Sequence, residues 1–394
     1  MKHNILILGA GYAGMLTATR LERLSAPFTM VNKKPYHYFT TLLHEAAGGR
    51  GNPIDYTVPI EKVFHKQTSQ LVVDEVTAIN REARTVTGKS GTYEYEYLVI
   101  ALGWVPEYFG IPGLAEHSLQ LSSVDAAAHI RQHIENEFKS YLQDQDLTHL
   151  RIAVGGAGLT GIELVGELLD WVPKLCVELG IDRHLVDVQN IEAMPNILPQ
   201  VSPDLREIAK LTLTERGAKL RTNTKIVKVE AGAVYVEGDE PVQAGTIIWT
   251  GGVRANPILA ESGFTVDRRG KAQVNAYLQS VDDDHIFVGG DSAGFQDENG
   301  KPVPPTAQTA SQMGKLIADN LTALMHGQLM RSFEYKSKGT LASLGPEVGV
   351  GDAFGIPVRG VVAGLAKEAT KVEHLWELGG LRLIADKSGD VVHL

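Results

Sequence analysis

Two glycine-rich turns with the same spacing, GAGYAG and GAGLTG, constrain this chain more than any other feature of its sequence. Each turn follows a short apolar run typical of a buried strand, and each leads into a segment with helical periodicity. A second apolar run follows each helical segment, so the sequence predicts two βαβ units. The predicted strand, turn, helix and strand are residues 4–8, 9–14, 12–24 and 28–31 in the first unit, and 151–154, 156–161, 162–179 and 186–191 in the second.

The glycine positions within each turn match the needs of a dinucleotide. The first glycine permits a tight turn, the second lets the backbone approach a pyrophosphate, and the third lets the helix pack closely on the strand. Free amides and the helix dipole then favour phosphates at the helix N-terminus. We therefore expect two nucleotide sites, with an ordinary glycine turn as the less favoured interpretation. The glycines are Gly9, Gly11 and Gly14 in the first turn, and Gly156, Gly158 and Gly161 in the second.

Polar residues that follow the strands indicate what each unit binds. Glu192 ends the second strand of the second unit, where a carboxylate accepts hydrogen bonds from ribose hydroxyls and repels a 2′-phosphate, so NADH is favoured over NADPH. A solvated strand-end glutamate is the alternative. The matching position of the first unit holds Asn32, followed by Lys33, so the expected acid is absent there. Asp291, in the turn VGGDSAG, is placed where an acid can bind a polyol.

Length, charge and cysteine content exclude several classes of protein. A chain of 394 residues is long enough for two or three domains. Its net charge of -10, without a basic run, argues against a nucleic-acid partner. No uninterrupted apolar stretch reaches the roughly 18 residues of a membrane span. Cys176 is the only cysteine, so no disulfide forms within the chain, which agrees with a reducing compartment. No metal site is predicted.

The order of the motifs resembles the flavoproteins with two dinucleotide-binding domains. GAGYAG, ALGWVP, GGAGLTGIE, TGGVRANP and VGGDSAG follow one another as in that superfamily. Within it, the chain is most similar to the type II NADH:quinone oxidoreductases, the non-pumping, membrane-attached respiratory dehydrogenases. That similarity covers essentially the whole chain and depends most on three stretches. They are HYFTTLLHEAAGG at 37–49, PPTAQTASQMG at 304–314 and GTLASLGPEVGVGDAFG at 339–355.

The resemblance implies an α/β fold with two Rossmann-like domains and a small C-terminal membrane-associating region. It implies non-covalent FAD in the first domain and NADH in the second. The domains are expected at 1–110 with 280–330 for FAD, 111–279 for NADH and 331–394 for the C-terminal region. The FAD residues implied are Gly9, Gly11, Gly14, Asn32, Lys33, His44, Asp291, Ala307 and Gln308. The NADH residues implied are Gly156, Gly158, Gly161, Glu192 and Gly252.

Three residues are expected to act in the reaction. Gln308 and Gln312 are four apart on a helix predicted over 300–324, so their amides face the same way, and the resemblance implies that they donate to a quinone carbonyl. Spacing alone favours an exposed glutamine pair. Glu163 is expected in the first turn of its helix, where the helix dipole stabilises a carboxylate. The resemblance instead implies that Glu163 orients NADH or takes part in proton movement towards the quinone.

The segment 357–378 has the periodicity of an amphipathic helix. From the sequence alone, packing of its apolar stripe on the protein body and contact with a membrane are equally favoured. In the resembled family this region is the membrane platform. The resemblance therefore implies peripheral attachment to the lipid bilayer on the cytoplasmic side of the cell membrane, and it leaves a homodimer open.

The implied activity is FAD-dependent oxidation of NADH with two-electron reduction of a menaquinone- or ubiquinone-type quinone, which feeds a respiratory chain. The single cysteine excludes disulfide reductases and sulfide:quinone reductases, which need further cysteines. Three alternatives stay open from the sequence. They are a reductase of a small electron-transfer protein such as ferredoxin or rubredoxin, a flavin-bearing redox sensor, and a naphthoquinone reductase of quinone biosynthesis.

Overall fold

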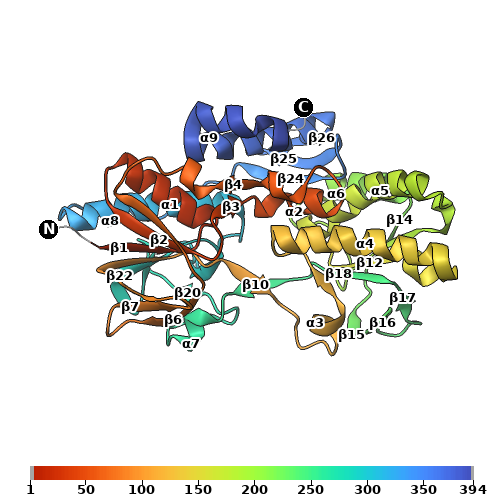
Figure 1. The fold of residues 1–394 in the computed structure, drawn as a ribbon, viewed down its shortest axis with the longest axis horizontal. Coiled ribbons are helices and arrows are strands. Elements are labelled where there is room, and N and C mark those ends of the chain that lie inside the picture. The colour runs from red at the N-terminus through yellow and green to blue at the C-terminus, as the bar shows by residue number, and fades with distance from the viewer. Residues whose placement is uncertain (1–3, 392–394) are drawn as a thin grey trace.

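Two mainly parallel sheets lie side by side along the long axis of the computed structural model, which describes residues 4–391 (Figure 1). A helix follows the central strand of each sheet, so the predicted fold of two Rossmann-like α/β units is confirmed. The first sheet has the order β21-β22-β9-β1-β2-β5, with β1 Ile5–Leu8, β2 Phe28–Asn32, β5 Ser69–Val73, β9 Tyr97–Ile100, β21 Gln279–Ser280 and β22 Asp283–Val288. The second has the order β11-β18-β12-β13-β14, with β11 Leu119–Gln120, β12 Arg151–Gly155, β13 Asp187–Ile191, β14 Ala218–Arg221 and β18 Thr246–Trp249.

The central strands form where the sequence is apolar without alternation, as parallel strands inside a covered sheet require. All four side chains of β1 are buried, because β1 pairs with β2 on one side and β9 on the other. Helices α1 Tyr12–Arg23 and α5 Leu159–Leu179 return the chain from β1 and β12. The remaining longer helices of the two units are α4 Val124–Asp144, α6 Pro203–Glu215 and α8 Ala307–Met325.

The chain passes between the two units twice, and the two connecting strands pair with each other. β10 Trp104–Pro106 and β19 Val253–Ala255 are antiparallel, with Val105 opposite Arg254. Figure 1 shows β10 between the two sheets. Because β21 and β22 come after the whole second sheet, the first unit is discontinuous in sequence. The domain boundaries given above stay predictions.

Short elements complete each unit. An antiparallel sheet of three strands flanks each main sheet, and short helices and the two-stranded sheets β3-β4 and β20-β23 connect the larger elements. The flanking strands are β6 Val76–Asn80, β7 Thr85–Gly88 and β8 Thr92–Glu94, and β15 Ile226–Glu230, β16 Ala233–Val236 and β17 Val242–Gln243. The short elements include α2 Leu43–Ala47, α3 Leu114–His117, α7 Ile258–Glu261, β3 Tyr36–Tyr38, β4 Thr57–Pro59, β20 Ala272–Gln273 and β23 Ala293–Gly294.

A hairpin sheet and a long helix form the C-terminal part and lie over both units (Figure 1). The sheet contains β24 Gly339–Ser343, β25 Gly349–Ala353 and β26 Ile356–Gly360, and α9 Val361–Val391 follows it with a kink at Gly380. β24 contacts α5 of the second unit, whereas α9 contacts α1 of the first. The C-terminal part therefore bridges the two nucleotide-binding units.

Two helices were predicted to begin too early in the sequence. α8 begins at Ala307 rather than residue 300, because Pro304 and Pro305 precede it and the Thr306 side chain caps it by accepting from the Thr309 amide. The amphipathic helix begins at Val361 rather than residue 357, because the preceding residues pair as β26 with β25. Apolar periodicity extends across such strand-to-helix junctions and does not mark them.

Candidate functional site: two nucleotide turns and a buried charge cluster

In the first glycine turn, a ligand has room to approach the backbone at Gly11 but not at Gly9 or Gly14. A Cβ atom on Gly9 would lie 2.4 Å from the Ala101 carbonyl oxygen, and one on Gly14 would lie 1.9 Å from the Gly9 carbonyl oxygen. A Cβ on Gly11 would meet nothing within 4 Å. Gly9 and Gly14 are therefore required by the fold, whereas Gly11 leaves space for a ligand beside the N-terminus of α1.

The second turn repeats this arrangement. A Cβ on Gly156 would lie 2.6 Å from the Gly251 Cα, and one on Gly161 would lie 2.0 Å from the Gly156 carbonyl oxygen. Gly158, the N-cap of α5, again has nothing within 4 Å. The two turns thus provide two equivalent, side-chain-free openings at helix N-termini, where phosphates are favoured.

The residues after the second strand of each unit also correspond. The Glu192 carboxylate accepts from the Ala157 amide at 2.7 Å and from the Met194 amide at 2.8 Å. In the first unit the Asn32 side-chain oxygen accepts from the Ala10 amide at 2.9 Å. Asn32 therefore supplies the same acceptor to the turn without a charge. Lys33, predicted beside FAD, forms a largely exposed ion pair with Glu75 at 3.1 Å.

Asp291 lies in a 3-10 turn, Gly290–Ser292, directly after β22. Within residues 4–391 its carboxylate has no hydrogen bond or ion pair, and burial raises its pKa. A half-buried acid that makes no hydrogen bond among the described residues fits a ligand that offers hydroxyl groups, such as a polyol. Ala307, at the start of α8, packs against a small cluster beside the first turn that consists of Tyr12, Ala13, Ala101 and Ala310.

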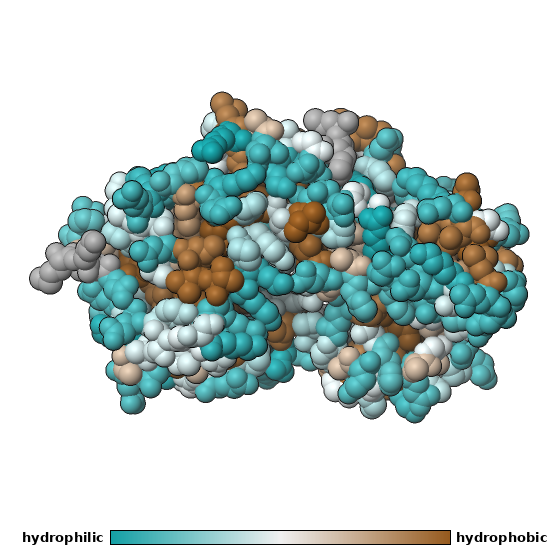
Figure 2. All heavy atoms as spheres, in the orientation of Figure 1, coloured by the Kyte–Doolittle hydropathy of each residue, from teal (hydrophilic) through white to brown (hydrophobic). Residues whose placement is uncertain are grey.

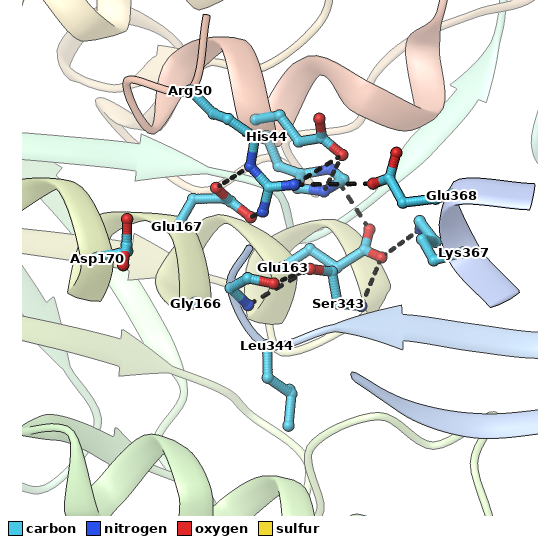
Figure 3. Close-up of polar contacts among 12 residues, drawn as sticks. His44, Arg50, Glu163, Gly166, Glu167, Asp170, Ser343, Leu344, Lys367 and Glu368 are labelled. Carbon is cyan, nitrogen blue, oxygen red and sulfur yellow. Dashed lines mark hydrogen bonds and ion pairs between the residues drawn. The ribbon is translucent and has the colours of Figure 1, made fainter. Parts of the chain in front are cut away.

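Glu163 lies in a cluster of buried charged residues between α2, α5 and α9 (Figure 3). Its carboxylate accepts from the Ser343 amide at 3.0 Å and from the Lys367 ammonium, and it lies 3.5 Å from His44 Nδ1. The expectation that Glu163 occupies the first helical turn was wrong. Because α5 begins at Leu159, Glu163 is in the second turn and is held by side chains and the β24 backbone rather than by the helix N-terminus.

The rest of this cluster continues one turn along α5. Arg50 bonds Glu167 through two nitrogens, and Lys371 pairs with Glu45 at 2.9 Å and with Glu368 at 2.7 Å. Burial raises the pKa of Glu167 to about 7, although the Arg50 guanidinium lowers it in part. We define the buried charge cluster as His44, Glu45, Arg50, Glu163, Glu167, Lys367, Glu368 and Lys371.

His44, predicted beside FAD, is a neutral member of the buried charge cluster. Burial, with a contribution from the Lys367 ammonium, holds the pKa of His44 well below its ordinary value of 6.5. Its Nε2 atom is buried and has no hydrogen-bond partner within residues 4–391. The cluster as a whole was missed from the sequence. Its one signal was Glu163 and Glu167, two acids four residues apart in the mostly apolar first half of α5.

The two predicted quinone-binding glutamines bond the same stretch of backbone. The Gln312 amide donates to the Lys336 carbonyl at 2.8 Å and accepts from the Lys336 amide at 3.0 Å. Gln308 accepts from the Lys338 amide at 2.7 Å and makes a longer bond, 3.4 Å, to the Gly339 carbonyl. Both side chains are therefore aligned on one face of α8, but their amides are not free of protein contacts.

The inner side of α9 combines buried charged residues with buried leucines, whereas a row of apolar residues faces outward. Glu368, Lys371 and His374 are buried, whereas Val362 is 62% exposed and Trp376 is 53% exposed. We define the exposed apolar row as Val361, Val362, Leu365, Trp376 and Leu381. Figure 2 shows hydrophobic side chains along the upper edge of the molecule, over α9. None of the helices within residues 4–391 has both the length and the hydropathy needed to span a membrane.

A histidine pair joins α9 to the first nucleotide turn. His374 Nε2 lies 3.0 Å from His37 Nε2, and His37 Nδ1 lies 2.7 Å from the Ala10 carbonyl oxygen. Because the carbonyl only accepts, His37 carries its proton on Nδ1 and accepts from His374 through Nε2. Burial lowers the pKa of His37 to about 4, so the pair is neutral near pH 7.

Comparison with known proteins identifies the class of this fold. Residues 3–314 match the family model described as pyridine nucleotide-disulphide oxidoreductase, which agrees with the two glycine turns and the discontinuous first unit. The structure of NDH2 from Plasmodium falciparum in complex with NADH has a TM-score of 0.90 and 18% identity, and the match covers 100% of this chain and 98% of that one. The sulfide:quinone oxidoreductase from Aquifex aeolicus has the same fold at a TM-score of 0.78 and 20% identity, with 95% and 91% of the two chains covered.

Relatives at higher identity define the family within that class. A type II NADH:quinone oxidoreductase from Staphylococcus aureus is 38% identical over 98% of both chains, and one from Staphylococcus epidermidis is 39% identical over 98% of both. The chain belongs to the type II NADH:quinone oxidoreductase family. The resemblance recognised in the sequence is therefore confirmed.

Proposed function

We propose that this protein oxidises NADH and passes two electrons through non-covalently bound FAD to a membrane quinone. The observation that carries the proposal is the pair of glycine turns, each of which leaves only its middle glycine, Gly11 or Gly158, open to a ligand. Two such openings in two joined units suit one chain that binds two dinucleotides. Membership of the type II NADH:quinone oxidoreductase family supports the choice of FAD, NADH and quinone.

The residues of the first unit fit FAD. Gly11 leaves room for the pyrophosphate, and Asn32 orders the turn through the Ala10 amide. Asp291, which makes no hydrogen bond among the described residues, suits the ribityl hydroxyls. In the second unit Gly158 and Glu192 have the corresponding roles for NADH, and the Glu192 charge disfavours a 2′-phosphate. FAD supplies the hydride acceptor and the electron donor, while the protein orients the substrates and excludes water.

Reduction of the quinone consumes a proton from solution in each turnover, because NADH delivers a hydride and the quinol carries two protons. We assign Glu163 to this proton movement or to the orientation of NADH, since its carboxylate is buried and is held by Lys367 and the Ser343 amide. The buried charge cluster around Glu163 includes Glu167, a carboxyl with a pKa of about 7. Such a group exchanges protons at neutral pH.

Gln308 and Gln312 are assigned to the quinone carbonyl. Each side-chain amide nitrogen carries two hydrogens, and one hydrogen bond from each goes to the backbone of the segment that follows α8. The second hydrogen of each is assigned to the quinone oxygen, which gains negative charge during reduction. Because an amide is neutral, these donors add no fixed charge beside the flavin.

The exposed apolar row on α9 is assigned to contact with the bilayer, the site of the quinone. Val361, Val362 and Leu365 suit the interfacial layer of a membrane, and Trp376 combines an apolar ring with a polar N–H. Glu368 and Lys371 of the same helix are held in buried contacts on its inner side, so these two charges do not lie on this surface. We place the protein as a peripheral protein on the cytoplasmic side of the cell membrane.

The test is an anaerobic two-step reaction of the purified holoenzyme. NADH should bleach the flavin absorbance bands within seconds, and a menaquinone analogue should then restore them. Bleaching without recovery by any quinone would contradict quinone reduction and point to a protein acceptor or a sensor. A purified protein without flavin bands, and with no FAD after reconstitution, would contradict the whole proposal.

A further inference from the structure

Phe109 is an aromatic residue whose exposure and backbone conformation are both unusual. Its side chain is 64% exposed, and its φ of +52° lies in the left-handed region that favours glycine. A strained, exposed aromatic residue is not explained by core packing. Such backbone outliers concentrate at functional sites, where the surrounding structure holds them in place.

The Phe109 ring lies directly over the loop that follows β18. A Cβ atom on Gly252 would lie 2.8 Å from Phe109 Cζ, and the ring meets Trp249 edge to face with centroids 6.4 Å apart. The next residue of this loop towards the strand, Gly251, packs against Gly156, the first glycine of the second nucleotide turn. Phe109 therefore lies one loop away from the predicted pyrophosphate position.

Hydrogen bonds hold the backbone segment that carries this ring. The Phe109 amide donates to the Glu107 side chain at 2.9 Å, and the Glu107 amide donates to the Gly252 carbonyl at 3.0 Å. Trp249 Nε1 donates to the Glu107 carbonyl at 2.8 Å. The segment that carries Phe109 is thus joined to the β18 loop by backbone and side-chain bonds, and the exposed ring is pre-organised for a ligand.

The register of the second sheet indicates which half of NADH lies near Phe109. Along the carboxyl edge, Trp249 of β18 is opposite Gly155 of β12, which is opposite Ile191 of β13. Glu192, assigned to the adenosine ribose, follows β13 on one side of the turn, so the nicotinamide half extends to the other side, over β18. Phe109 lies on that side, where β10 and β19 lead towards the first unit.

We infer that Phe109 forms an aromatic wall for the nicotinamide half of NADH and positions it for hydride transfer. This inference rests on the proposed function, and it names a specific contact within it. An aromatic face contributes to nucleotide binding by stacking, and the hydrogen-bonded backbone that carries the ring lowers the cost of ordering it. The left-handed backbone at Phe109 is the conformation that keeps the ring over Gly252 rather than in the core.

The test measures how tightly NAD+ and ADP-ribose bind to holoenzyme variants that are altered at Phe109 or at Phe354. Phe354 is the matched control, because it is also exposed and left-handed, with a φ of +51°, but lies in the β25–β26 hairpin. Phe109→Gly removes the ring and suits the backbone conformation, so the protein should stay folded. We expect the Kd for NAD+, measured by calorimetry, to rise roughly tenfold, with the Kd for ADP-ribose unchanged within about twofold. Phe354→Gly should change neither, and Phe109→Tyr should restore NAD+ binding.

The pattern of results separates this inference from the proposed function. Unchanged NAD+ binding in Phe109→Gly would overturn the inference, and so would equal losses for NAD+ and ADP-ribose. Neither result would contradict the proposed oxidation of NADH by the wild-type protein. Conversely, a wild-type holoenzyme whose flavin is not reduced by NADH would contradict the proposed function, whatever the variants bind.

Discussion

Asn32 and Glu192 occupy equivalent positions in the two nucleotide units, but only Glu192 is charged. Both accept from the amide that follows the first glycine of their turn, Ala10 in one unit and Ala157 in the other. The backbone contact therefore needs only an oxygen acceptor, and the charge at Glu192 is available for selecting the ligand. Discrimination against a 2′-phosphate is the property that we expect this charge to control.

Glu192→Gln should reduce the preference for NADH and keep the contact with the glycine turn. The glutamine oxygen keeps the Ala157 contact, as Asn32 does for Ala10, while its NH2 group gives up the Met194 contact and does not repel a 2′-phosphate. We expect the ratio of kcat/KM for NADH to that for NADPH to fall about tenfold. Glu207→Gln, an exposed change on α6, is the control. A preserved ratio would mean that Glu192 acts only through the backbone.

Glu167 should impose a pH dependence on stability. Its folded pKa of about 7 lies above the ordinary value of 4.5, so between these values the folded state holds a proton that the unfolded state releases. The free energy of unfolding therefore falls as the pH rises from about 4.5 to about 7, by at most about 1.4 kcal/mol per pH unit from this group. Below about pH 4.5 the contribution of Glu167 to the free energy of unfolding is complete, and above about pH 7 it is lost.

Glu167→Gln should remove this part of the pH profile, because glutamine does not titrate. Denaturant unfolding at a series of pH values measures the effect directly. Glu178→Gln, an exposed change on the same helix, is the control and should leave the profile unchanged. An identical slope in wild type and Glu167→Gln would show that Glu167 is ionised across this range.

The packing of helix α9 on the protein could not be predicted from the apolar periodicity of its sequence. Periodicity predicts two faces, but it does not state which face packs on the protein. Here Lys371 and Glu368 point inward because α2 supplies Glu45 and the following loop supplies Arg50. These partners are more than three hundred residues away in sequence. Only the fold brings them together, so neither the burial of the charges nor the exposed apolar row was predictable from α9 alone.

Leu365→Asp should weaken membrane contact without unfolding the protein. Leu365 is 52% exposed within the exposed apolar row, so a charge there costs little in water but opposes insertion between lipids. We expect the fraction that floats with phospholipid vesicles to fall severalfold, with unchanged NADH reduction of the flavin. Val177→Asp places the same charge at an exposed apolar site on α5 and should leave flotation intact. Equal flotation of all three proteins would exclude this row as the membrane contact.

The whole molecule contains the same nucleotide turn twice, and this repetition gives a paired prediction. Gly11→Ala and Gly158→Ala add a Cβ where nothing lies within 4 Å, so both variants should fold. Gly11→Ala should purify with little flavin, whereas Gly158→Ala should keep flavin that NADH no longer bleaches. The two variants should show different defects, because we assign FAD to the opening at Gly11 and NADH to the opening at Gly158.

The third glycines provide the contrasting pair. Gly14→Ala and Gly161→Ala place a Cβ about 2 Å from a carbonyl oxygen, a contact that side chains do not make, so both should be strongly destabilised. Flavin absorbance per protein and the Tm measure both effects. Stable, yellow Gly14→Ala protein would contradict the packing role of the third glycine.

Much of this architecture was predictable because it is local in sequence. A strand, a glycine turn and a helix follow one another within about thirty residues. Their apolar side chains indicate which elements are buried, and their glycines indicate where a phosphate can approach the backbone. The buried charge cluster is different, since Arg50, Glu167 and Lys371 come from separate parts of the chain. The contacts of Gln308 and Gln312 with the segment after α8 were also not predictable, because that segment has no periodic pattern.

The discontinuity of the first unit has a consequence for how the protein is made. A growing chain completes the second unit while β9 still has an open edge, because its partner β22 has not been synthesised. Asp291, Ala307 and the histidine contact from α9 to the first turn arrive later still. Domains fold as units during synthesis, so a nascent chain of this protein has a finished NADH-type unit beside an unfinished one. We therefore expect flavin to be inserted after the chain is released, and truncated products that lack β22 to be colourless.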